Sequence, residues 1–258
     1  MEICPERELS VPRDNARQSR PAQQAQTLLV IPTYNEAGNL ERLVREIAQQ
    51  GVELDLLIID DHSPDGTGTL AETLSTQFPM RVIHRPRKLG IGSAHRRGFD
   101  YALAHGYPSV ITMDADFAHG PEYLPMMLAQ VSSADVIIAS RYLRGGGLSG
   151  WQLYRRLLTH TAHWLTTRLL GLPYDCTGGF RLYKTRILQA IDFSQIHSDG
   201  YAFLIELAYQ VSRTGCSIRE IPIVINSRHT GVSKISRHEI LNAVKTLVRL
   251  SLRRLRGQ

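Results

Sequence analysis

Cysteine is scarce in this sequence, and long apolar runs are missing from it. The three cysteines, Cys4, Cys176 and Cys216, are far apart and form no Cys-x-x-Cys pair. Neither a disulfide framework nor a zinc site is therefore indicated, and a reducing compartment fits. No secretory signal opens the chain, and no apolar run approaches the roughly 18 residues that a membrane-spanning helix needs. We accordingly expect a protein that stays in the cytosol and at most lies on a membrane surface.

The composition suffices for one large hydrophobic core. Of the 258 residues, 43% are hydrophobic and 21% are charged, which fits a single domain of catalytic size. Residues 1–26 are rich in Gln, Arg, Glu and Pro and contain little to bury, so we expect a disordered N-terminal tail. The rest of the chain divides into an expected domain over residues 27–235 and a C-terminal helix over residues 236–258.

The positive charge of the chain is concentrated at its C-terminal end. From Arg228 onward there are eight Lys or Arg and one Glu, so this segment carries +7 and the preceding residues sum to −1. Apolar residues within 236–255 recur at helical spacing, and Lys245, Arg249 and Arg253 form a cationic stripe. The pattern indicates a basic amphipathic helix.

Two interpretations of this helix remain open. Basic amphipathic helices lie in the headgroup region of anionic membranes, where each basic residue contributes on the order of 1 kcal/mol. Alternatively, the helix packs on the core and exposes a solvated basic face. We expect no nucleic-acid partner, because the helix lacks the aromatic residues that stack on bases.

Strand and helix patterns alternate along the first half of the chain. Short apolar runs predict strands, and between them apolar residues recur at the spacing of an amphipathic helix. The expected strands are residues 27–31, 54–59, 81–84, 110–113 and 135–140. After a glycine hinge at 145–147, the pattern predicts helices over 151–170 and 201–211 and a last strand over 218–225. The alternation predicts an α/β protein with a mainly parallel sheet and helices on both faces, in which ligands bind at the carboxyl ends of the strands.

Acidic residues follow two of these strands. Asp114 and Asp116 come after the fourth strand, and an extended backbone would place both side chains on one side. Asp60 and Asp61 end the second strand, so the four acids would meet at one edge of the sheet. A divalent cation would relieve the repulsion between Asp114 and Asp116, because Mg2+ binds one or two carboxylates together with substrate phosphates. An isolated Asp-x-Asp also fits a solvated loop.

Six motifs occur in a characteristic order. They are residues 32–36, 60–67, 113–116, 140–142, 178–184 and 228–234. Singly, these motifs fit helix caps, turns and solvated charge. Together they resemble the family 2 glycosyltransferases, and most closely the polyprenyl-phosphate (dolichol-phosphate) mannose synthases, over about residues 27–236.

The resemblance implies a fold, a reaction and its partners. The fold would be the GT-A nucleotide-diphosphosugar transferase fold, and the reaction would transfer mannose from GDP-mannose to a polyprenyl monophosphate. Inversion at the anomeric carbon would give a β-linked product, and Mg2+ or Mn2+ would serve as cofactor. Such an enzyme would be peripheral on the cytosolic face of a membrane, where it would meet the membrane surface and an integral-membrane partner protein.

The resemblance also assigns roles to individual residues. The implied metal ligands are Asp114 and Asp116. The implied donor-binding residues are Pro32, Tyr34, Glu36, Ile59, Asp61, Asp114, Ala115, Asp116, Arg228 and Lys234, and the implied catalytic residues are Asp116, Arg141, Arg228 and Lys234. These cations would neutralise charge on the departing diphosphate. The acceptor needs no strong general base, because a phosphate monoester is already largely ionised near neutral pH.

One departure and two alternatives qualify this interpretation. Ala118 stands where many relatives carry Gln or Ser, so a third side-chain contact to the metal is lost. The same architecture could transfer another sugar, such as glucose from UDP-glucose. A module that binds a nucleotide sugar or a lipid without turnover would also fit the pattern, and the two Asp residues would then have no catalytic role.

Overall fold

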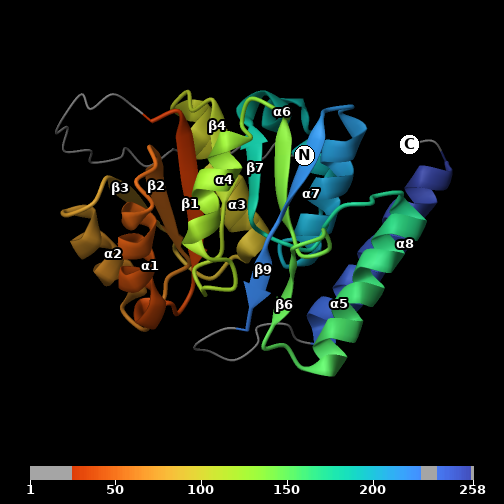
Figure 1. Cartoon of the computed structure of the whole chain (residues 1–258), viewed down its shortest axis with the longest axis horizontal. Helices are drawn as coiled ribbons and strands as arrows, with labels where there is room; N and C mark the ends of the chain where they lie inside the picture. Colours follow the sequence, from red (N-terminus) through yellow and green to blue (C-terminus); the bar gives the residue numbers. More distant parts are fainter. Residues whose placement is uncertain (1–24, 228–236, 257–258) are drawn as a thin grey trace, which may run out of the picture.

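A seven-stranded sheet runs through the centre of the molecule, which the computed structural model describes over residues 25–227 and 237–256 (Figure 1). In spatial order its strands are β3 (Met80–His84), β2 (Asp55–Asp60), β1 (Thr27–Thr33), β4 (Ser109–Thr112), β7 (Arg181–Lys184), β5 (Val136–Ser140) and β8 (Ile218–Pro222). Strand β7 is antiparallel to both of its neighbours, and the other strand pairs of this sheet are parallel. The predicted α/β class and mainly parallel sheet are confirmed.

Helices cover both faces of the sheet because the strand residues alternate between two cores. In β1, Leu29 and Ile31 join the hydrophobic cluster that contains α1 (Ala37–Gln49), α2 (Thr67–Ser75) and α4 (Leu124–Ala129). Leu28 and Val30 join the cluster on the other face, with α3 (Ile91–Ala104), α6 (Thr185–Ala190) and α7 (Ala202–Arg213). Successive side chains of a strand point to opposite faces, so a strand that is apolar throughout requires both layers.

Strand β7 and the split of the last strand were not predicted. β7 inserts between β4 and β5, and its first residue, Arg181, is buried with its guanidinium donating to the carbonyl oxygens of Leu204 and Asp175. A buried arginine in a four-residue strand gives no hydrophobic pattern. The expected strand over 218–225 ends as β8 at Pro222, and β9 (Val224–Asn226) pairs instead with β6 (Gly147–Ser149). The last glycine of the expected hinge therefore belongs to a second, two-stranded sheet.

Helices α5 (Leu153–Leu165) and α8 (Arg237–Leu255) both lie at one edge of the molecule (Figure 1). The chain continues from α5 as a π-helical turn, η2 (Thr166–Leu170), so the predicted helix over 151–170 is largely confirmed. Helix α8 packs on α7 and η2, with Leu247 and Leu250 buried in a third hydrophobic cluster. No helix in the described ranges is long and apolar enough to cross a membrane. The expected N-terminal tail lies almost wholly outside the described residues.

A buried carboxylate ties α8 to α7. Glu206 of α7 is only 1% exposed and accepts hydrogen bonds from the backbone N–H of His197 (2.6 Å) and the hydroxyl of Ser198 (2.8 Å). The guanidinium of Arg249 in α8 also donates to it. Arg249 was predicted to belong to the exposed cationic stripe. The structure turns it toward the core, because a buried carboxylate needs a charged partner.

His95 is a second buried polar residue, on the face of α3 that meets the sheet. It is 1% exposed, its ring lies 5.9 Å from that of Phe203, and neither ring nitrogen has a hydrogen-bond partner within the described residues. Burial, assisted by the charge of Arg181, lowers the pKa of His95 from 6.5 to about 3. The folded protein therefore holds this imidazole neutral.

This shift predicts an acid-sensitive stability. Between about pH 6.5 and pH 3 the unfolded chain binds a proton at His95 that the folded chain does not, so the free energy of unfolding falls as the pH falls. The slope from one such group is at most about 1.4 kcal/mol per pH unit. Urea unfolding of His95→Leu across this range should show a flatter acid limb than the wild type. His197→Leu, at an exposed position, should keep the wild-type slope, and equal slopes for all three proteins would contradict the assignment.

Candidate functional site

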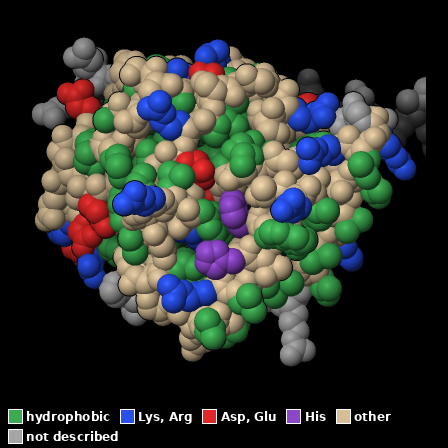
Figure 2. Space-filling model, turned by 45° about the vertical axis from the view of Figure 1, so that its right-hand side comes forward, with side chains coloured by type: hydrophobic (Ala, Val, Ile, Leu, Met, Phe, Trp, Pro, Cys, Tyr) green, Lys and Arg blue, Asp and Glu red, His purple; other side chains and the backbone are tan. Residues whose placement is uncertain are grey.

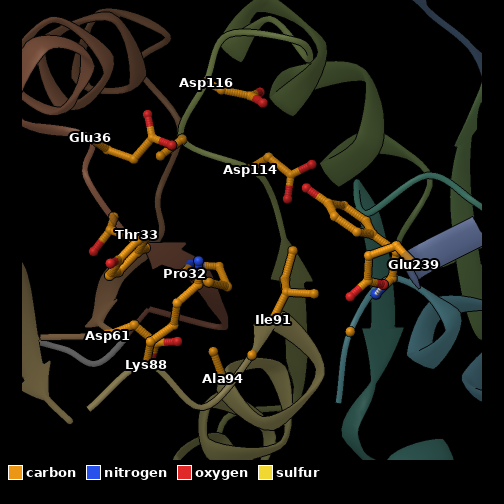
Figure 3. A pocket seen from close by; sticks show the side chains of 15 residues that line it. Pro32, Thr33, Glu36, Asp61, Lys88, Ile91, Ala94, Asp114, Asp116 and Glu239 are labelled. Atoms are coloured by element: carbon orange, nitrogen blue, oxygen red, sulfur yellow. Dashed lines mark hydrogen bonds between the residues drawn. The ribbon is translucent and has the colours of Figure 1, made fainter. Parts of the chain in front are cut away.

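A pocket of about 160 Å³ opens at the carboxyl ends of β1, β2 and β4 (Figure 3). The chain leaves β1 toward β2 on one side and reaches β4 on the other, so the pocket lies where the strand order reverses. The residues that line it are Pro32, Thr33, Tyr34, Glu36, Asp61, Lys88, Gly90, Ile91, Ala94, Asp114, Ala115, Asp116, Gly200, Tyr201 and Glu239. They come from the ends of three strands, the start of α3, the turn before α7 and the first turn of α8.

Asp114 and Asp116 border the pocket where β4 ends, as predicted (Figure 3). Asp116 is buried and accepts a hydrogen bond from the backbone N–H of Ala118 at 3.0 Å. Oδ2 of Asp114 lies 3.9 Å from Nδ1 of His119, which is also buried. The backbone N–H of Ala118 therefore fixes the Asp116 carboxylate.

Asp61 is held on the opposite side of the pocket by a network of donors. The guanidinium of Arg85 and the backbone N–H of Leu89 (3.2 Å) both donate to its carboxylate. The same guanidinium donates to the hydroxyl of Ser93 (2.6 Å) and the carbonyl oxygen of Gly90 (3.1 Å). Asp61 thus positions the loop between β3 and α3, which carries the pocket residues Lys88 and Gly90.

The charge of the pocket is strongly negative. Among the described residues, its lining contains five acids (Glu36, Asp61, Asp114, Asp116 and Glu239) and one lysine. Lys88 lies with Nζ 4.0 Å from the ring centroid of Tyr34, and Arg85 balances Asp61. The remaining excess of carboxylates favours a cation, and an anionic ligand would need such a cation to bind here.

The donor set fits a hard divalent cation that is completed by a ligand. The described residues contain no cluster of three or more His, Cys, Asp or Glu that would form a closed metal site. Two carboxylates with open positions for water and phosphate oxygens match the usual coordination of Mg2+. A Cβ atom at Gly179 would lie 3.2 Å from Oδ1 of Asp114, so glycine at this position keeps room for the Asp114 carboxylate.

Most of the predicted donor-binding residues line the pocket, but Ile59 does not, and neither does Arg141, which was predicted to be catalytic. Ile59 is fully buried, because its side chain packs in the hydrophobic core that β2 shares with α3. Arg141 forms an ion pair with Asp175 (2.8 Å) outside the pocket lining. Arg228 and Lys234 lie outside the described residues.

The partner of Arg141 is a structural anion. Asp175 is fully buried, which alone would raise the pKa of its carboxyl, but Arg141, Arg181 and the backbone N–H of Thr177 outweigh burial and lower this pKa. Its carboxylate also accepts from the N–H of Gly178 at 3.1 Å. Asp175 therefore stays ionised and orients Arg141 beside the glycines that precede β7.

Several pocket residues were not predicted from the sequence. Ile91 begins α3 and Lys88 lies in the loop before it, and neither was among the predicted site residues. Glu239 comes from the first turn of α8, and its carboxylate accepts a hydrogen bond from the backbone N–H of Tyr201 at 3.0 Å. No sequence signal could identify Glu239, because its role arises from the packing of α8 beside the turn before α7.

Comparison with known proteins finds a matching family and similar relatives over most of the chain. The model for "Glycosyl transferase family 2" matches residues 28–192. Polyprenol monophosphomannose synthase of Mycolicibacterium smegmatis is 41% identical over 248 residues, which is 95% of this chain and 92% of that protein. Undecaprenyl-phosphate mannosyltransferase of Micrococcus luteus is 38% identical over 227 residues, which is 87% of this chain and 93% of that protein.

Solved structures share the fold at lower sequence identity. Mannosyl-3-phosphoglycerate synthase of Rubrobacter xylanophilus gives a TM-score of 0.64 at 20% identity, covering 90% of this chain and 74% of that one. Glucosyl-3-phosphoglycerate synthase of Mycobacterium tuberculosis was solved with Mn2+, UDP and glucosyl-3-phosphoglycerate. It gives a TM-score of 0.63 at 19% identity, covering 88% of this chain and 80% of that one. At these identities the likeness shows the fold alone, which is the GT-A fold that was predicted.

The contact at Gly179 predicts a metal-binding defect. In Gly179→Ala the new methyl group must displace the Asp114 carboxylate by a few tenths of an ångström, and we expect the affinity for Mn2+ to fall about tenfold. Electron paramagnetic resonance of free Mn2+, with a nucleoside diphosphate present, measures this affinity. Gly38→Ala, where a Cβ atom meets nothing within 4 Å, is the matched control. Unchanged Mn2+ affinity in Gly179→Ala would contradict the role given to Asp114.

Proposed function

The chain belongs to glycosyl transferase family 2 and is a glycosyltransferase, and we propose that it transfers mannose from GDP-mannose to a polyprenyl monophosphate. Two relatives that align over most of their length are named for mannose transfer to a polyprenyl phosphate or for its product. The observation that carries the proposal is the pair of carboxylates, Asp114 and Asp116, at the pocket where β4 ends. A sugar nucleotide contains the diphosphate that such a pair binds through a cation.

Each side of the pocket has a role in donor binding. Pro32, Tyr34 and Asp61 line the side at β1 and β2, and we assign them to the nucleoside. Ala115, between the two acids, brings its backbone to the pocket. Among the described lining residues, Lys88 supplies the one cationic side chain. Arg228 and Lys234 remain proposed phosphate contacts outside the described residues.

Asp114 and Asp116 would hold Mg2+ or Mn2+ together with the donor diphosphate. The bound cation would neutralise the charge that develops on the diphosphate as it leaves the sugar. Asp116 is fixed for this task by the backbone N–H of Ala118, and Gly179 leaves space beside Asp114. Preorganised carboxylates need not move during the reaction, which lowers its free-energy barrier.

The acceptor phosphate would attack without a strong general base. Its second pKa is about 6, so the attacking oxygen already carries negative charge near neutral pH. The task left to the protein is to bring two anions together in line, which we assign to Arg141, Arg228 and Lys234. In-line attack inverts the anomeric carbon and gives a β-linked mannosyl phosphate.

The nature of the acceptor sets the place of action. A polyprenyl phosphate is anchored in a bilayer, so we propose a peripheral enzyme on the cytosolic face of a membrane, with an integral-membrane protein as a further partner. This placement agrees with a structure in which no described helix can cross a bilayer.

Transfer of labelled sugar into solvent-extractable lipid tests the proposal. Purified protein with polyprenyl phosphate in detergent and Mg2+ should incorporate label from GDP-mannose, and none after the metal is chelated. Asp116→Asn should lower the rate at least about a hundredfold, because one preorganised electrostatic contact is lost. Asp100→Asn, an exposed acid on α3, should retain the wild-type rate.

Other outcomes of this assay would change the proposal in defined ways. Label from UDP-glucose alone would change the donor, and a product with the α configuration would remove the inverting mechanism. A wild-type rate in Asp116→Asn would exclude the metal-dependent mechanism. No label from either donor, with a membrane fraction added, would favour a binding module.

A further inference from the structure

Helix α5 and the outward side of α8 expose a large apolar surface, and we propose that this surface binds an anionic lipid bilayer. We call it the α5–α8 face. It consists of Leu153, Tyr154, Leu157, Leu158 and Trp164 of α5, Leu169 of η2, and Ile240, Leu241, Val244, Val248, Leu252 and Leu255 of α8. The inference rests on the proposed function for its biological reason, because a polyprenyl acceptor lies in a membrane.

Helix α5 cannot be explained as a core helix. None of its residues is buried, and Leu153, Leu157 and Trp164 are 82%, 67% and 58% exposed. Burying a leucine side chain stabilises a folded protein by about 1.5–3 kcal/mol. The exposed leucines of α5 do not contribute this stabilisation in the isolated protein. Single exposed apolar residues are ordinary, but a contiguous group of them marks an interaction surface.

The two sides of helix α8 have different surroundings. Its sequence left open whether the helix packs on the core or lies on a membrane. Leu247 and Leu250 are buried against α7, and Arg249 is directed to Glu206. Val244, Val248 and Leu252 recur every four residues on the exposed side. The helix therefore packs on the core and also presents an apolar stripe outward.

The two helices are joined where α5 continues into η2. A guanidinium nitrogen of Arg254 in α8 donates to the carbonyl oxygen of Leu169 in η2 at 3.2 Å. Both helices lie at the same edge of the molecule (Figure 1). In Figure 2, which turns this edge forward, hydrophobic side chains gather toward the lower right with Lys and Arg side chains near them. The apolar residues of both helices thus belong to one surface.

The charge near this surface indicates what binds to it. Residues 151–171 and 240–256 contain no Asp or Glu. Besides Arg249, which pairs with Glu206, their charged residues are Arg155, Arg156, Arg168, Lys245, Arg253, Arg254 and Arg256. Cations beside an apolar face complement anionic headgroups, and each one near the surface adds about 1 kcal/mol. A second copy of the chain would bring the same cations together across a symmetric interface, where they repel. The balance favours an anionic membrane over self-association.

Aromatic residues and the pocket agree with this orientation. Tyr154 and Trp164 are exposed on α5, and amphipathic rings of this kind reside at headgroup level. Glu239, in the first turn of α8, lines the pocket. A bilayer bound along α8 would therefore lie next to the pocket, where the phosphate of a membrane-embedded acceptor has to arrive.

Flotation of the full chain with vesicles tests the proposal. The wild type should float with phosphatidylcholine vesicles that contain phosphatidylglycerol and bind less to pure phosphatidylcholine. Leu153→Ser/Leu157→Ser should weaken partitioning at least about tenfold, because two exposed leucines no longer insert. The double variant keeps Trp164. On addition of vesicles, the emission maximum of this tryptophan should shift to shorter wavelength in the wild type and much less in the double variant. Met126→Ser, an exposed apolar residue on α4, is the matched control.

Failure of this inference and failure of the proposed function are distinguishable. Vesicles without acceptor report on the face alone, while sugar transfer in detergent reports on the pocket alone. Wild-type flotation of the double variant, or no vesicle binding by the wild type, would overturn the inference. So would light scattering showing that the double variant only converts a dimer to a monomer. Reduced flotation with unchanged transfer in detergent would support it.

Discussion

The repulsion between two neighbouring carboxylates at the end of a buried strand is the constraint on which this structure depends. Asp114 and Asp116 stand at the carboxyl end of β4, where the switch in strand order leaves a pocket. Three other buried acids of the described residues have an arginine partner: Asp61 with Arg85, Asp175 with Arg141, and Glu206 with Arg249. Asp114 and Asp116 border a pocket whose lining, in the part of the chain that the structure describes, contains one lysine. Such a site suits a cation that arrives with a diphosphate.

The arginine pairs also explain how distant parts of the chain are brought to the pocket. Arg85 links the end of β2 to the loop before α3, and Arg249 fastens the C-terminal helix to α7. Fastened in this way, α8 contributes Glu239 to the pocket at one end and an apolar stripe to the surface along its length. The candidate active site and the proposed membrane surface thus both depend on the packing of α8 against α7.

Local patterns were sufficient to predict much of the fold and the centre of the site. Strands apolar throughout, such as β1, indicate burial on both faces, and acids directly after β2 and β4 must meet at one sheet edge. What the sequence could not show depends on long-range packing. Buried Arg181 conceals β7. The side chain of Ile59 packs in the core with α3 and not in the pocket, and Glu239 reaches the pocket because α8 packs beside the turn before α7. The exposure of α5 was equally hidden, since its apolar pattern is the one expected of a core helix.

The central claim is that the carboxylates of the pocket bind a sugar nucleotide through a divalent cation. Isothermal titration calorimetry with GDP, in the presence and in the absence of Mg2+, tests it most directly. The account predicts measurable binding with Mg2+ and a loss of at least about tenfold in affinity without it, since the lining is strongly acidic. GDP binding of equal strength with and without the cation would contradict the claim.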